Sequence, residues 1–131
     1  MHSLNTIIII IMVACLLPYV FSIIARISSG YDSKLHDNPR EHVNKAQGLA
    51  ARANAVQKNS FEGLSLFLTA ILLSDYLVIP DHLVIQIGIA YLVLRIIYGM
   101  CYLMNLKALR SIIWLLSTLC PVILLFICMR L

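Results

Sequence analysis

Long apolar stretches alternate with short polar ones along the chain. The first, residues 5–27, contains the run IIIIIMVACLLPYVFSII, which is longer than the roughly 7–15 residues of a signal-peptide core. Residues 82–104 and 111–129 form two further apolar stretches with few charges. Each has about the 20 residues that a helix needs to cross a bilayer. The pattern therefore predicts membrane-spanning helices at these three positions.

A different pattern marks residues 45–76, which begin polar (KAQGLAARANAVQKNSFEG) and become apolar (LSLFLTAILL). We interpret them as a fourth spanning helix whose polar half lies within the membrane. The segment before it is polar, and Asn38-Pro39 predicts a turn there. Because the connections between consecutive helices are short, we expect an all-α, up-and-down bundle of four transmembrane helices, residues 1–131 forming one membrane domain.

Composition supports a membrane protein. Apolar residues make up 61% of the chain and charged residues 12%, against roughly 45–50% and about 25% in soluble domains. This composition disfavours a soluble enzyme. The net charge of +4 is not gathered into a basic run, so we expect no nucleic-acid partner. The four cysteines lie in apolar stretches without metal-ligand spacing, which indicates small core residues and no metal site.

Basic residues predict the orientation in the membrane. They flank the first and third loops, which we therefore expect in the cytoplasm, with both termini on the other side. The asymmetry fits a bacterial inner membrane, and an endoplasmic reticulum membrane is the alternative. The residues concerned are Arg26, Lys34, Arg40 and Lys45 at the first loop, and Lys107 and Arg110 at the third.

Charged residues inside spanning helices cost at least about 2.5–3.5 kcal/mol each, so they indicate a cavity, a partner or a function. In the second helix Arg52, Asn59 and Glu62 lie within roughly 80° of one another around the helix axis. They are placed to line one wall of a cavity.

The third helix carries a second polar stripe, confined to about 60° and at a similar depth. Its members are Tyr91, Arg95, Tyr98 and Tyr102. With Arg110 at the mouth, we expect a cytoplasm-facing pocket for a small anionic or zwitterionic ligand, because guanidinium groups bind carboxylates. If the ligand bears a thiol, Arg110 or Arg95 would stabilise its thiolate. The alternatives are packing for Arg95, an aromatic belt for Tyr102 and lipid headgroup contact for Arg110.

Two segments resemble a known family. RANAVQKNSFEGLSLF, starting at Arg52, and RIIYGMCY, starting at Arg95 and followed by Arg110, are similar to the second-helix and third-helix motifs of MAPEG proteins, the membrane-associated proteins in eicosanoid and glutathione metabolism. The resemblance covers nearly the full chain. The acid at Glu62, later than in typical enzymatic members, resembles a divergent bacterial-type branch.

The resemblance implies a homotrimer that binds glutathione as co-substrate between subunits. It implies transferase or peroxidase activity on lipophilic electrophiles or hydroperoxides that enter from the bilayer. Arg110 would stabilise the glutathione thiolate, and a group of polar residues would hold glutathione: Arg52, Asn59, Glu62, Arg95, Tyr98 and Tyr102. A non-catalytic lipid-binding or scaffold protein on the same fold is the alternative.

Overall fold

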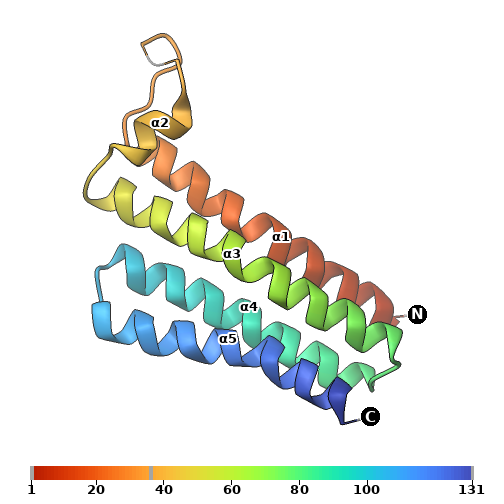
Figure 1. Cartoon of the computed structure of the whole chain (residues 1–131). Coiled ribbons are helices and arrows are strands. Elements are labelled where there is room, and N and C mark those ends of the chain that lie inside the picture. Colours follow the sequence, from red (N-terminus) through yellow and green to blue (C-terminus); the bar gives the residue numbers. More distant parts are fainter. Residues whose placement is uncertain (1, 36, 131) are drawn as a thin grey trace.

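The computed structural model describes residues 2–35 and 37–130. The described residues form four long helices, which lie side by side and alternate in direction (Figure 1). Short helix α2 lies at one end of them, and the two ends of the chain lie at the other. The all-α class predicted from the sequence is confirmed for the described residues. The helices are α1 (His2–Ser28), α2 (Pro39–Asn44), α3 (Leu49–Tyr76), α4 (Asp81–Leu103) and α5 (Lys107–Met129).

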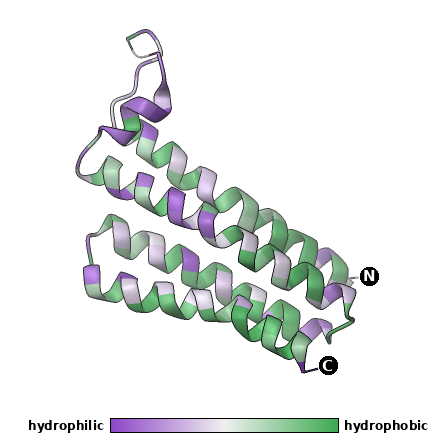
Figure 2. Cartoon of the chain, viewed as in Figure 1, coloured by the Kyte–Doolittle hydropathy of each residue, from purple (hydrophilic) through white to green (hydrophobic). Residues whose placement is uncertain are grey.

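Three of these helices, α1, α4 and α5, are long and apolar enough to cross a membrane, within the part of the chain that the structure describes. They fit a multi-pass membrane protein. Helix α3 is as long but is not among them, because polar residues fill its first half. Figure 2 shows this hydrophilic region next to the hydrophilic α2 end, whereas the opposite end of the helices is mostly hydrophobic.

Two helix starts lie four residues from the predicted ones. Helix α3 begins at Leu49 rather than residue 45, because Gly48 has a left-handed φ of 67° that separates it from the preceding turn. Helix α5 begins at Lys107 rather than residue 111, directly after a tight turn in which Asn105 has a φ of 61°. Arg110 therefore belongs to the first turn of α5, and its N–H donates to the Leu106 carbonyl.

Helix α2 occupies a segment for which the sequence predicted only a turn. Asn38 is its N-cap, and the Asn38 side chain accepts the N–H of Arg40 at 3.0 Å. Pro39 stands at the first helical position, where its missing N–H costs nothing. The pair that predicted a turn thus starts a helix, because Asn followed by Pro also suits a helix N-terminus.

Helices α1 and α4 approach closely at Gly99. A Cβ at this position would overlap the ring of Phe21 on α1. Phe21 belongs to a buried apolar cluster with Val56 of α3 and Tyr98 of α4. A larger cluster nearer the chain ends includes Phe67 and Tyr91, whose rings stack at 3.9 Å between centroids. These contacts fix α3 and α4 relative to each other on both sides of the polar residues between them.

Candidate functional site

Arg95 of α4 is the centre of a buried polar network and is only 3% exposed. Its Nη2 donates to Asn59 Oδ1 at 2.6 Å and to Ser60 Oγ at 3.3 Å, both on α3. Its Nη1 donates to Ser117 Oγ of α5 at 3.3 Å. A single guanidinium therefore joins three helices, and its three hydrogen-bond partners are neutral.

The third nitrogen of this guanidinium makes no hydrogen bond within the described part of the chain. Arg95 Nε is buried and has no hydrogen-bond partner among the described residues. Arg95 lines a cavity of about 220 Å³, whose wall also contains Asn59, Glu62, Tyr91 and Trp114. A buried donor without an acceptor costs about 1–3 kcal/mol.

Two arginines and two tyrosines make consecutive contacts from Arg95 to the first turn of α5. The Arg95 Cζ lies 4.5 Å from the ring centroid of Tyr98. Tyr98 meets Tyr102 edge to face at 5.8 Å. The Arg110 Cζ then lies 3.9 Å from the ring centroid of Tyr102. These cation–π contacts each contribute about 0.5–2 kcal/mol and hold both guanidinium groups in place.

Arg110 faces a second cavity, of about 490 Å³. Its walls include Asn59, Tyr98, Ser111 and Trp114. Asn59 and Trp114 line both this cavity and the one beside Arg95, so the two lie next to each other. We call the two together the α3–α5 site.

The structure brings most of the predicted residues together. Asn59, Glu62 and Arg95 line the first cavity, and Asn59, Tyr98 and Arg110 line the second. Tyr102 lines neither cavity but contacts the Arg110 guanidinium.

Arg52 is placed apart from the others. Its Nε donates to the Leu103 carbonyl at 3.2 Å, and it lines neither cavity of the α3–α5 site. This hydrogen bond joins α3 to the C-terminal turn of α4.

Among the residues that sequence reasoning missed are two hydrogen-bond partners of Arg95 and one residue of the cavity wall. Ser60 and Ser117 are buried partners of Arg95, at 5% and 0% exposure. Trp114 is 41% exposed and forms a wall shared by both cavities. The serines carry no charge that would mark them in the sequence, and their contacts with Arg95 depend on how the helices pack.

The chemistry available at the site is anion binding. Two guanidinium groups, one with an unused donor, lie near a carboxylate and several hydroxyl groups. Such a set can hold a ligand that carries carboxylates and an ammonium group, because guanidinium groups bind carboxylates and Glu62 can bind the ammonium.

One comparison with known proteins found a match. A model of the MAPEG family matches residues 6–130, nearly the whole chain. No curated protein and no solved structure matches the chain.

Proposed function

The chain belongs to the MAPEG family, and we therefore propose that it is a membrane-embedded, glutathione-dependent transferase or peroxidase. Its second substrates are lipophilic electrophiles or hydroperoxides. The family match over residues 6–130 is the observation that carries the proposal.

Glutathione fits the residues of the α3–α5 site. It carries two carboxylates, an ammonium group and a thiol. In our proposal the guanidinium of Arg95 binds a carboxylate of glutathione, and Glu62, which lines the same cavity, accepts from the ammonium. We assign Asn59 and Tyr98 to the same ligand because both line the cavity next to Arg110. A contact between Arg52 and glutathione stays a prediction.

Arg110 is the proposed catalytic residue. Arg110 is partly buried and lines the larger cavity, and its guanidinium lies over the ring of Tyr102. A cation beside the glutathione thiol lowers the pKa of that thiol and so raises the fraction of the nucleophilic thiolate. The lipophilic substrate would meet the thiolate here, where Leu115 and Trp114 supply an apolar wall.

We infer further that α3 crosses the membrane as a fourth span inside a homotrimer. Exposed polar residues form a ridge along α3 at spacing i, i+3 and i+7, which is one face of a helix. This ridge consists of Glu62, Ser65 and Thr69. Facing lipid, it would be costly, and covering it with neighbouring copies of the chain removes that cost. In our proposal the α2 end faces the cytoplasm of a bacterial cell, and an endoplasmic reticulum membrane is the alternative location.

A non-catalytic lipid-binding or scaffold function is the second candidate. It is favoured by the three neutral hydrogen-bond partners of Arg95, which satisfy most of this side chain without any ligand. In that case the buried network serves packing alone.

Glutathione binding distinguishes the two candidates. Purified protein in detergent is titrated with glutathione by calorimetry, and thiolate formation is followed by ultraviolet absorbance at neutral pH. The catalytic proposal expects binding at or below millimolar glutathione with thiolate absorbance. Absence of binding at millimolar glutathione would favour the scaffold function.

A further inference from the structure

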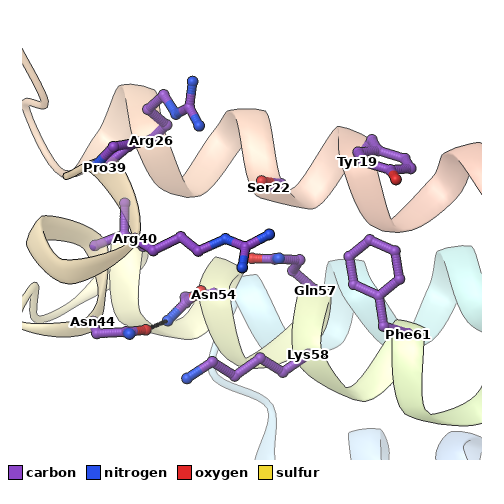
Figure 3. Close-up of a pocket in the computed structure, with 11 residues that line it drawn as sticks. Tyr19, Ser22, Arg26, Pro39, Arg40, Asn44, Asn54, Gln57, Lys58 and Phe61 are labelled. Atoms are coloured by element: carbon purple, nitrogen blue, oxygen red, sulfur yellow. Dashed lines mark hydrogen bonds between the residues drawn. The ribbon is translucent and has the colours of Figure 1, made fainter. Parts of the chain in front are cut away.

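A third cavity, of about 570 Å³, lies on the other side of α3, between α1, α2 and α3 (Figure 3). It shares no lining residue with the α3–α5 site. We call it the α1–α3 cavity. Its lining residues are Tyr19, Ser22, Arg26, Pro39, Arg40, Val43, Asn44, Asn54, Gln57, Lys58 and Phe61.

The charges around this cavity have one sign. Arg26, Arg40 and Lys58 come from three different helices, and no carboxylate among the described residues lines the cavity. The carboxylate next in sequence to Arg40, that of Glu41, pairs with Lys45 at 3.2 Å instead. Three cations around one cavity without an acidic partner favour an anionic ligand.

Helix α2 positions Arg40 for this role. The capping of α2 by Asn38 fixes the backbone of Arg40, whose N–H donates to the Asn38 side chain. Figure 3 shows the Arg40 guanidinium reaching into the space between α1 and α3, beside Gln57. Asn54 Nδ2 donates to Asn44 Oδ1 at 3.0 Å, which ties α3 to the last residue of α2.

The far end of the cavity is apolar. Tyr19 and Phe61 meet there edge to face at 5.3 Å, away from the arginines in Figure 3. On α1, Tyr19, Ile23 and Arg26 have i, i+4 and i+7 spacing and so share one face. Ile23 is 58% exposed. A ligand bound by the cations would thus have an apolar surface beside it.

We propose that the α1–α3 cavity binds the headgroup of an acidic phospholipid. The phosphate lies between Arg40 and Lys58, and the acyl chains run along the Tyr19–Ile23 face of α1. Basic pockets between spanning helices bind anionic lipid headgroups through this combination of charge and apolar surface. The inference needs α1 to lie in a membrane, which its length and composition fit, and it does not depend on glutathione chemistry.

The test measures lipid binding to the full chain in a neutral detergent. Protein is titrated with short-chain phosphatidylglycerol, short-chain phosphatidylcholine and soluble glycerol phosphate, and thermal shifts give the affinities. The variant R40Q/K58Q removes two cations from the cavity. The control K34Q/K107Q makes the same change in net charge at exposed residues that line neither the α1–α3 cavity nor the α3–α5 site.

We expect phosphatidylglycerol to bind more tightly than either other ligand. R40Q/K58Q should bind phosphatidylglycerol about 30-fold more weakly than the wild type, since each cation near a membrane surface contributes about fivefold. The affinity of the control K34Q/K107Q should stay within about twofold of the wild-type value. Equal binding of the two phospholipids, or unchanged affinity in R40Q/K58Q, would overturn the proposal. If glycerol phosphate binds as tightly as phosphatidylglycerol, the cavity recognises the phosphate alone. That result would overturn the assignment of a lipid.

The last measurement tests whether glutathione competes with phosphatidylglycerol. If glutathione displaces phosphatidylglycerol competitively, the cavity belongs to the glutathione site and the lipid proposal fails. If wild-type protein binds phosphatidylglycerol as expected but no glutathione, the lipid proposal stands and the proposed enzymatic function fails.

Discussion

Arg95 Nη2 lies 2.6 Å from Asn59 Oδ1, and this hydrogen bond joins α4 to α3 between two buried apolar clusters. Asn59 also lines both cavities of the α3–α5 site. One amide therefore takes part in the stability of the fold and in the shape of the proposed ligand site.

Asn59→Ala should destabilise the protein by about 1–3 kcal/mol, because it removes an acceptor from a buried cation. Unfolding in detergent, followed by circular dichroism, measures this change. Asn54→Ala is the matched control, since Asn54 is an amide on the same helix that bonds to Asn44 at the α2 end. Equal losses in the two variants would argue against a special role for the Arg95 contact.

Arg95→Leu should weaken glutathione binding about 10- to 100-fold, because a charge-assisted hydrogen bond contributes about 1.5–3 kcal/mol. Arg95→Lys should recover part of the affinity, since it keeps the charge but loses the planar fork. Calorimetric titration gives both affinities. A more stable Arg95→Leu protein with unchanged affinity would assign the network to packing alone.

Arg110→Ala should reduce turnover of a lipophilic electrophile at least about tenfold and abolish thiolate absorbance, while glutathione still binds through the Arg95 end. The physical reason is the loss of the cation that stabilises the thiolate. Arg130→Ala provides the control, because Arg130 caps the opposite end of α5. An unchanged rate would remove Arg110 from the mechanism.

Gly99→Ala should destabilise the protein by about 1–3 kcal/mol, since the new methyl group overlaps the Phe21 ring and forces α1 away from α4. The double variant G99A/F21L should recover part of the loss, because leucine leaves room for the methyl group. Gly63→Ala is the control, as its Cβ would meet only the Tyr91 hydroxyl, at 3.4 Å. Thermal unfolding of the four proteins measures the effect.

Ser65→Trp should reduce the mass of the detergent-solubilised particle from three chains to one, because Ser65 belongs to the α3 ridge assigned to the subunit contact. Val122→Trp places the same side chain on an exposed apolar position of α5 and should leave the trimer intact. Light scattering coupled to chromatography gives the masses. A wild-type particle of one chain would contradict the trimer directly.

The sequence was most informative where spacing alone determines a contact. Tyr98 and Tyr102 lie four residues apart on one helix, so their meeting follows from helical geometry. Contacts between helices were harder. That Arg52 bonds to the carbonyl of Leu103 could not be predicted, because a main-chain acceptor on another helix leaves no signal in residue type. For the same reason Ser117 was missed, since its role depends on how α5 lies against α4.

Local sequence also has two meanings at Asn38-Pro39. The pair suits a turn and the first residues of a helix equally, and the contacts of the next few residues decide between them. Here His42 Nε2 lies 2.9 Å from the Ser29 carbonyl and Val43 is buried, so α2 is fixed against the rest of the chain. That short helix is what brings Arg40 to the α1–α3 cavity.

Trp114 is the only tryptophan of the chain, and it lines both cavities of the α3–α5 site. Its indole fluorescence is consequently a built-in optical probe of this site, free of background from other tryptophans and without any attached dye. Stopped-flow emission could follow ligand arrival in real time, and collisional quenchers dissolved in water or in the lipid phase would report from which phase the site is reached.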